Sequence, residues 1–193
     1  MKSLLFYFYR IKSIIHNTGA DWDKLAPAIE DAINFAHEYI NPEPVVKIDG
    51  HDSLEYALAA GGIHINDRFR KDQADVNDIN IVNMVSTHSC KKDLVLYRGV
   101  FEDVYDLMIE NAKALNDIDL FEKGFMQCSI VKGHETNHRT KLRIYVPEGS
   151  AVIYLGNVNG EQGSYEVVIQ RGAKLKIISA DETYINCKLI ETA

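Results

Sequence analysis

The chain has 193 residues, of which 46% are hydrophobic and 25% are charged, as in ordinary globular domains. This length is enough to bury a core without disulfides or structural metals. The formal net charge of −7, from 28 acidic and 21 basic side chains, disfavours sequence-independent binding of nucleic acid, which needs a cationic surface. We expect a single domain over residues 1–193, with a helical part over about 1–92 and a β-rich part over about 93–193.

The first apolar stretch, residues 4–15, is interrupted by polar side chains and is too short to span a bilayer. It also lacks a small-residue cleavage site, so we expect a helix or strand packed on the domain and neither a membrane anchor nor a signal peptide. The three cysteines, Cys90, Cys128 and Cys187, form no Cys-x-x-Cys pair. This spacing disfavours a disulfide framework or a zinc cluster and suits a reducing compartment.

The first half of the sequence has the periodicity of helices. Apolar residues recur every three or four positions over residues 23–40, which predicts an amphipathic helix. The segment Asn41-Pro42-Glu43-Pro44 should end that helix, because proline lacks a donor and restricts the residue before it. A shorter helix is predicted over residues 53–60, ending at Gly61-Gly62, and another over residues 75–88.

The second half has the pattern of short strands separated by turn residues. A strand over residues 94–97 precedes a helix over residues 101–114. Further β-rich segments are predicted over residues 125–131, 141–146, 151–155, 165–170, 174–178 and 185–190. Helices followed by strands indicate an α+β fold and not the alternating order of a Rossmann sheet.

Three segments on predicted strands carry polar residues suited to chemistry. Tyr97-Arg98-Gly99 ends a strand with an arginine, which is costly to bury unless an anion pairs with it. Residues 124–129, Gly-Phe-Met-Gln-Cys-Ser, place polar side chains among apolar ones. Residues 161–172 form a polar loop that leads into a strand bearing a lone carboxylate, Glu166. Each segment alone is a weak signal, because an arginine before glycine is usually a structural ion pair.

Together and in this order, the segments resemble the ADP-ribosyltransferase exotoxin family, which includes clostridial Rho-modifying exoenzymes and actin-modifying binary toxins. That family has a strand ending in Tyr-Arg-Gly, a Gly-aromatic-x-Ser-Thr-Ser strand, and a Glu/Gln-x-Glu strand that continues into Val-Leu-Leu-Pro-Arg-Gly. A fourth segment, Ile65-Asn66-Asp67-Arg68-Phe69-Arg70, looks like the Ile-Asn-x-x-Leu-Arg helix start of the family. The resemblance covers roughly residues 56–178. It implies two small antiparallel sheets that form an NAD cleft, flanked by the N-terminal helices.

Two departures from the family pattern bear on function. The Ser-Thr-Ser triplet reads Gln127-Cys128-Ser129, so its last serine alone is retained, and the details of NAD binding are open. The residue two before Glu166 is Ser164, where arginine-modifying members have Glu and asparagine-modifying members have Gln. This change removes the usual clue to the acceptor.

The resemblance implies roles for individual residues in cleaving NAD, which is the substrate. Glu166 would stabilise the positive charge that grows on the ribose as nicotinamide departs, a contribution that electrostatics makes large. Ser129 would orient Glu166, and Arg98 would hold the diphosphate through its planar fork. The backbone of Gly99 would reach the nicotinamide amide, since glycine permits close approach. The remaining expected cofactor contacts are Asn66, Arg70, Gln127 and Arg171, and Ser164 is counted with the catalytic residues.

The segment His134-Glu135-Thr136-Asn137-His138 matches the zincin signature HExxH, which needs both histidines on one helical face. Thr136 and Asn137 are poor helix formers, Gly133 precedes them, and a strand is predicted directly afterwards. We therefore expect a loop here and no metal.

The sequence therefore predicts a mono-ADP-ribosyltransferase that moves ADP-ribose from NAD to a macromolecular acceptor, most simply a protein, with release of nicotinamide. An NAD glycohydrolase is the enzymatic alternative, and a non-catalytic binding module on a degenerate transferase fold is the other. We expect action in a cytosol, either that of its own cell or that of a host after delivery, with neither a membrane nor nucleic acid as partner.

Overall fold

The computed structural model describes residues 8, 18–158, 160 and 163–193, so most of the apolar stretch at residues 4–15 lies outside the described part. The described helices are α2 (Thr18–Asp23), η1 (Ile29–Asp31), α3 (Ala32–Tyr39), α4 (Leu54–Arg70), α5 (Val76–Ser86) and α6 (Glu102–Ala112). The described strands are β1 (Lys47–Ile48), β2 (His51–Asp52), β3 (Leu94–Val100), β4 (Leu120–Glu122), β5 (Met126–Ser129), β6 (Thr140–Val146), β7 (Val152–Gly156), β8 (Glu166–Ile169), β9 (Ala173–Ala180) and β10 (Ile185–Glu191). None of the described helices is long and apolar enough to cross a bilayer.

The predicted helix over residues 23–40 is wrong in its first half, where a turn separates α2 from η1 and α3. The cause is Pro27, whose ring removes a donor and disfavours helical backbone at the preceding residue. Ala28 is extended, with φ −65° and ψ 155°, and helical structure resumes after it. The predicted apolar stripe survives in α3, which buries Ala32 and Ala36.

Helix α4 runs through Gly61-Gly62 to Arg70, so the predicted end at the two glycines is also wrong. Gly62 is the point at which the helix approaches β5, and a Cβ atom there would lie 2.3 Å from the amide nitrogen of Gln127. The glycine therefore permits close helix–sheet packing. The segment expected at a helix start, residues 65–70, instead forms the last turns of α4.

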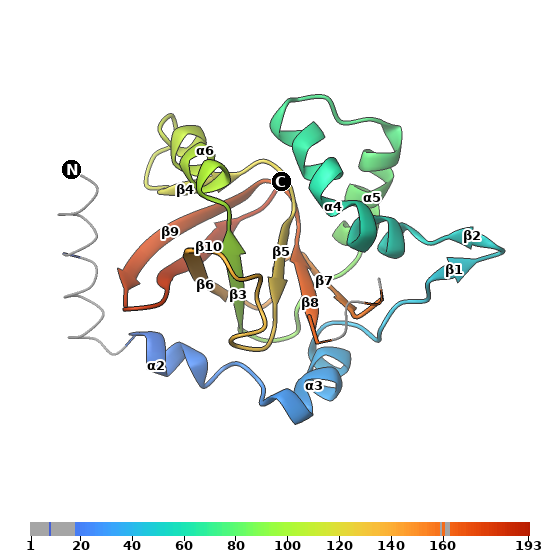
Figure 1. Cartoon of the computed structure of the whole chain (residues 1–193), viewed down its shortest axis with the longest axis horizontal. Helices are drawn as coiled ribbons and strands as arrows, with labels where there is room; N and C mark the ends of the chain where they lie inside the picture. The colour runs from blue at the N-terminus through green and yellow to red at the C-terminus, as the bar shows by residue number, and fades with distance from the viewer. Residues whose placement is uncertain (1–7, 9–17, 159, 161–162) are drawn as a thin grey trace.

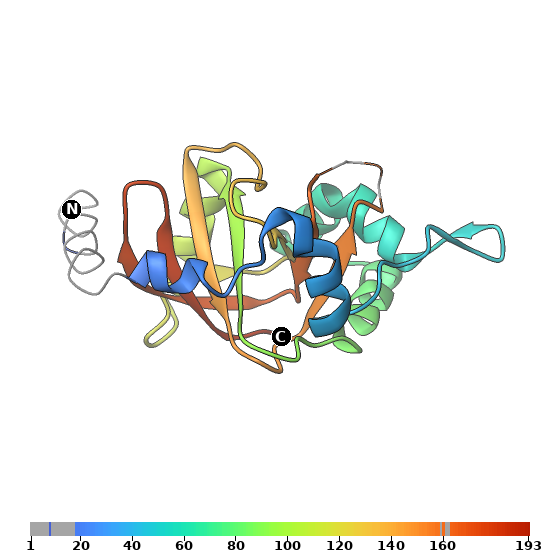
Figure 2. The same ribbon diagram turned by 90° about the horizontal axis from the view of Figure 1, so that it is seen from below.

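The helices predicted over residues 75–88 and 101–114 are confirmed as α5 and α6, and all seven predicted strands are present. Two features were not predicted, the short strand β4 and the β1–β2 hairpin. Asp49 and Gly50 form the hairpin turn with φ of 50° and 80°, the backbone that an Asp-Gly pair favours in tight hairpins. The hairpin projects from the body of the molecule beside α4 (Figures 1 and 2).

The larger strands form one eight-stranded sheet in the order β4-β9-β10-β6-β3-β5-β8-β7. The α+β class is confirmed, and the structure joins the two expected antiparallel sheets into one. The β10–β6 pair is parallel, and the two halves of the sheet are joined. That joint between β3 and β5 consists of one described residue pair, Tyr97 with Ser129, whereas β3 and β6 pair over seven residues. The two expected sheets are thus halves of one sheet with a narrow seam.

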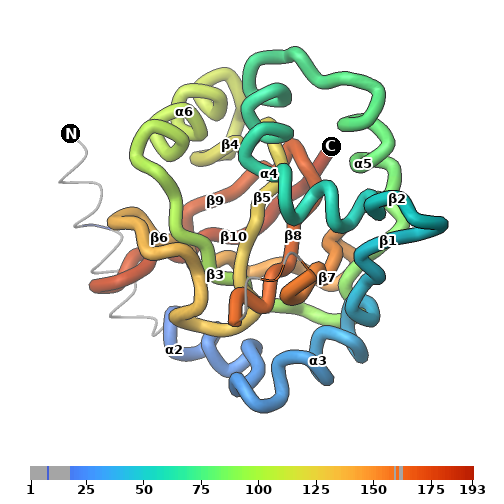
Figure 3. Tube along the Cα trace, turned by 45° about the vertical axis from the view of Figure 1, so that its right-hand side comes forward, coloured from blue at the N-terminus to red at the C-terminus, as the bar shows by residue number. Residues whose placement is uncertain are grey.

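Helices pack on both faces of this sheet (Figures 1 and 3). The larger apolar core includes side chains of α3 and α6, and a second core includes side chains of α4 and α5. Alternate residues of β8 enter different cores, Val167 the larger one and Val168 the one beneath α4 and α5. Residues on β8 that share a face with Val168 therefore point toward α4.

Candidate active site

The seam of the sheet brings together three strands that carry predicted site residues. On β3, Arg98 follows Tyr97, which is paired with Ser129 of β5. Ser129 is in turn the cross-strand partner of Glu166 on β8. Directly opposed residues on neighbouring strands lie close together. Three segments that are far apart in the sequence thus meet at one place.

Arg98 is mostly buried, with 8% of its surface exposed, and it spans the seam. Its Nη1 donates to the backbone carbonyl of Gln127 at 3.0 Å. Its Nε is buried and makes no hydrogen bond with any described residue. A buried guanidinium donor without a partner costs free energy, and an anion at this position would remove that cost.

Glu166 is 9% exposed and lies at the first position of β8. The amide Nε2 of Gln127 donates to its Oε1 at 3.2 Å. The two side chains share a sheet face, because Gln127 lies two residues before Ser129, the partner of Glu166. Gln127 therefore links the arginine and the carboxylate, accepting from Arg98 through its backbone and donating to Glu166 through its side chain.

Ser129 is buried and faces the same side as Glu166, but its Oγ accepts a hydrogen bond from the backbone N–H of Val131 at 3.1 Å. A described donor to Glu166 is the side chain of Gln127, at the first position of the triplet, where the family has serine. The family resemblance predicts the orienting role for Ser129, the retained serine of the triplet, and a cofactor contact for Gln127. The middle residue, Cys128, is buried, and burial raises the pKa of its thiol to about 12, so the thiol stays neutral.

Gly99 lies directly beneath the loop between β5 and β6. A Cβ atom at Gly99 would sit 1.9 Å from the carbonyl oxygen of Thr136, which no side chain could tolerate. The Thr136 hydroxyl also donates to the Gly99 carbonyl at 3.3 Å. The glycine is therefore required by the loop that covers it.

That loop contains the HExxH segment, and it is not helical, as predicted. Glu135 is buried and accepts hydrogen bonds from Gly133 N–H at 2.8 Å, Lys141 Nζ at 2.8 Å and Tyr184 Oη at 2.9 Å. Glu135, which would be the general base in a zincin, thus serves here to hold the loop in place through hydrogen bonds. Within the described residues, no three His, Cys, Asp or Glu side chains are grouped to hold a metal ion.

The loop before β8 contacts the β5–β6 loop. His134 shares a 2.7 Å hydrogen bond between its Nδ1 and the Gly163 carbonyl, and its ring contacts that of Tyr165 at 5.4 Å. Ser164 Oγ donates to the carbonyl of Gly156, the last residue of β7, at 3.1 Å. Tyr165 has φ of 44°, a left-handed conformation that is costly for a bulky residue. The residue before Glu166 is therefore held in a strained backbone.

Asn66 and Arg70 support the site from α4. Asn66 pairs with the backbone of Phe125 in both directions, accepting from its N–H at 2.7 Å and donating to its carbonyl at 3.1 Å. Arg70 donates to both carboxylate oxygens of Glu122, at 2.9 and 3.1 Å. Glu122 also accepts from Gly124 N–H. Asn66 and Arg70 thus hold the segment that leads into β5, and their side chains are hydrogen-bonded to other residues of the protein.

Arg171 is the predicted site residue that the structure places apart from the others. It follows the end of β8, whereas Glu166 begins that strand. At about 3.3 Å per residue, the strand alone separates its ends by about 10 Å. The Arg171 guanidinium lies over the ring of Phe69, 4.7 Å from the ring centroid, in a hollow at the end of β8 opposite to Glu166.

Comparisons with known proteins concern the family and the fold of the chain. A family model described as ADP-ribosyltransferase exoenzyme matches residues 52–192. The fold is similar to that of the Clostridium limosum C3 exoenzyme (TM-score 0.62, 16% identity, 84% of this chain and 95% of that chain covered) and of C3stau2 from S. aureus with NAD (0.62, 16%, 85% and 96%). It is also similar to C3larvin toxin from Paenibacillus larvae (0.55, 15%, 71% and 92%). No curated protein matches the chain in sequence.

Proposed function

Because this chain belongs to the ADP-ribosyltransferase exoenzyme family, we propose that Arg98, Gln127 and Glu166 form the centre at which it cleaves NAD. The chain is an NAD-dependent mono-ADP-ribosyltransferase, as the motifs of the sequence predicted. The observation that carries the assignment of the centre is the hydrogen-bonded series from Arg98 through Gln127 to Glu166.

In this reaction the bond between the ribose C1′ and the nicotinamide nitrogen breaks, and neutral nicotinamide leaves with the electron pair. The ribose becomes positively charged in the transition state, and the carboxylate of Glu166 stabilises that charge. An acceptor nucleophile then bonds to C1′ and loses its proton. Gln127 helps to orient the carboxylate, because its amide donates a hydrogen bond to Oε1 of Glu166.

Arg98 is proposed to hold the NAD diphosphate, which would take up its unpaired buried Nε. Gly99 is proposed to face the nicotinamide amide and Ser129 to contact the nicotinamide ribose. Asn66 and Arg70 serve this site by fixing the start of β5. Arg171 is not included in this set, because it lies beyond the opposite end of β8.

The acceptor is proposed to be a protein. The proposed place of action is a cytosol, either that of the cell that makes the protein or that of a host cell after delivery. Ser164, two residues before Glu166, is proposed to face the acceptor. Its small side chain provides neither the carboxylate nor the amide that other members present there. Acceptor selection should therefore depend on the rest of the β7–β8 loop, which includes the strained Tyr165.

The function is tested by incubating the full chain with NAD labelled on its adenylate part and a eukaryotic cell lysate. The expected result is a labelled protein band that appears with the wild-type chain and is absent with Glu166→Gln. Nicotinamide release without any labelled band would contradict a protein acceptor. Absence of both would contradict the assignment of the centre.

A further inference from the structure

The hollow around Arg171 gathers positive charge in an otherwise acidic chain. It has a volume of about 290 Å³, and its lining includes Lys123, Arg171, Lys174 and Asp72, with Glu191 paired to Lys174 beside it. These five side chains carry three positive charges and two negative ones, a net of +1, whereas the whole chain carries −7. Such a local reversal of sign concentrates anions from solution.

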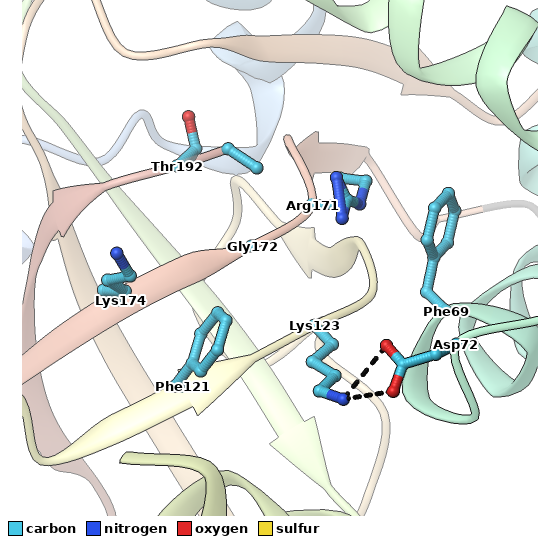
Figure 4. A pocket seen from close by; sticks show the side chains of 9 residues that line it. Phe69, Asp72, Phe121, Lys123, Arg171, Gly172, Lys174 and Thr192 are labelled. Atoms are coloured by element: carbon cyan, nitrogen blue, oxygen red, sulfur yellow. Dashed lines mark hydrogen bonds and ion pairs between the residues drawn. The ribbon is translucent and has the colours of Figure 1, made fainter. Parts of the chain in front are cut away.

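Two aromatic rings hold the cations in place. The Arg171 guanidinium lies 4.7 Å from the centroid of Phe69, and Lys174 Nζ lies 5.8 Å from that of Phe121. Figure 4 shows these side chains around the hollow, with the Lys123–Asp72 ion pair at its edge. Stacking fixes the plane of a guanidinium and leaves its N–H edge free for a ligand.

Arg171 is poorly satisfied by the protein itself. Its Nε is buried without a hydrogen-bond partner among the described residues, and no described carboxylate forms an ion pair with it. Lys123 and Lys174 are paired with Asp72 and Glu191, but those carboxylates are 76% and 58% exposed. Exposed pairs contribute about 0–1 kcal/mol, so an incoming anion can displace them at small cost.

We propose that this hollow is a binding site for the diphosphate or monophosphate group of a small soluble molecule, separate from the NAD site. The planar fork of Arg171 suits two phosphate oxygens, and the two lysines supply point charges on either side. The volume lies at the lower end of ligand pockets, which favours one compact group over a whole dinucleotide. The site lies beyond the end of β8 opposite to Glu166.

The test is titration calorimetry of the full chain with inorganic pyrophosphate, and with ADP in a second arm. Pyrophosphate should bind with a Kd on the order of 0.1 mM. Arg171→Gln should weaken it at least tenfold, because a charge-assisted fork is lost. Lys174→Gln, at a partly exposed position that should fold normally, should weaken it severalfold. The matched control is Lys24→Gln, which removes an exposed lysine just after the end of α2 and should leave the affinity unchanged.

Because ADP is part of NAD, the ADP arm is run on Glu166→Gln with its NAD site saturated by NAD. Binding by ADP under this condition that is tighter than binding by pyrophosphate would identify a nucleotide as the source of the phosphate, and equal affinity would identify a free diphosphate. Saturating NAD, added to the Glu166→Gln variant so that it is not consumed, should leave pyrophosphate binding unchanged. Displacement of pyrophosphate by NAD would overturn the proposal, since the hollow would then belong to the NAD site. No binding, or equal binding by Arg171→Gln, would overturn it as well.

Discussion

Gln127 shows how a single side chain can replace a motif residue through geometry. Its longer side chain reaches Glu166 Oε1 at 3.2 Å, and Gly62 on α4 leaves the space that it occupies. The motif comparison could locate this position but could not reveal its role, because role depends on which side chains share a sheet face. The register of β5 and β8, which places Gln127 on the same face as Glu166, indicates the role of Gln127 better than the presence of Ser129 in the motif does.

Gln127→Ala should lower kcat about tenfold, because a hydrogen bond to a charged group is worth about 1.5–3 kcal/mol. The affinity for NAD should change less than twofold if the amide acts through Glu166. Steady-state release of nicotinamide and titration with NAD measure the two quantities. Gln127→Ser, which keeps a donor and restores the residue of the family motif, is the control and should lose less. Full kcat in Gln127→Ala would show that Glu166 is held in another way.

Arg98→Lys should mainly weaken NAD binding, by about tenfold or more, because lysine keeps the charge but loses the bidentate fork. The loss should appear in calorimetric titration of NAD. Since Arg98 also donates to the Gln127 carbonyl, thermal unfolding of the same variant checks that the seam is intact. An unchanged NAD affinity would make Arg98 a purely structural residue.

At the scale of elements, the β5–β6 loop depends on one buried carboxylate. Burial alone raises the pKa of Glu135, but hydrogen bonds from Lys141 and Tyr184 outweigh it and hold the pKa below its usual value. The carboxylate is therefore ionised at neutral pH and ties the loop to β6 and to Tyr184, just before β10. This arrangement places Thr136 against Gly99, next to Arg98.

Glu135→Ala should lower the free energy of unfolding by about 2–3 kcal/mol, because the Lys141 ammonium loses its buried partner. It should also raise the KM for NAD, because a loose loop must be ordered again when NAD binds. Tyr184→Phe removes one neutral donor and should cost about 1 kcal/mol with little effect on KM. Denaturant unfolding and NAD kinetics provide the two measurements. An unchanged KM in Glu135→Ala would show that the order of the β5–β6 loop does not affect NAD binding.

The elements themselves could be predicted to different extents from sequence. Strands β6 to β10 follow from short β-rich runs between turn residues, and their positions are confirmed. The helix errors arose where one local signal was overlooked or outweighed: Pro27 was missed, and packing against Gln127 overrode the glycine pair in α4. The seam between β3 and β5 could not be predicted, because pairing between distant strands leaves no local pattern.

For the whole molecule, buried ion pairs determine how stability depends on acidity. The hydrogen bond from Arg68 lowers the pKa of Asp78, and hydrogen bonds lower that of Glu135 despite its burial. A carboxyl whose pKa is lower in the folded state stabilises the fold above its unfolded pKa, about 4, and loses this contribution as pH falls through the folded value.

The denaturation midpoint should therefore change little from pH 7 to about pH 5 and fall below about pH 4. Chemical denaturation at a series of pH values measures this. Asp78→Asn should be less stable at pH 7 and should show a shallower loss in acid, because one of the titrating groups is gone. A midpoint that rises on acidification would contradict the role given to these pairs.

The central claim is that Glu166 stabilises a positively charged ribose in the transition state. Glu166→Gln keeps the size of the side chain and removes its charge, so turnover of NAD should fall by on the order of 10² to 10³ or more, while NAD affinity changes little. Glu110→Gln, at an exposed glutamate on α6, is the matched control and should keep wild-type turnover. The decisive measurement is nicotinamide release by both variants together with their Kd for NAD. Nearly full turnover in Glu166→Gln, with NAD still bound, would contradict the account.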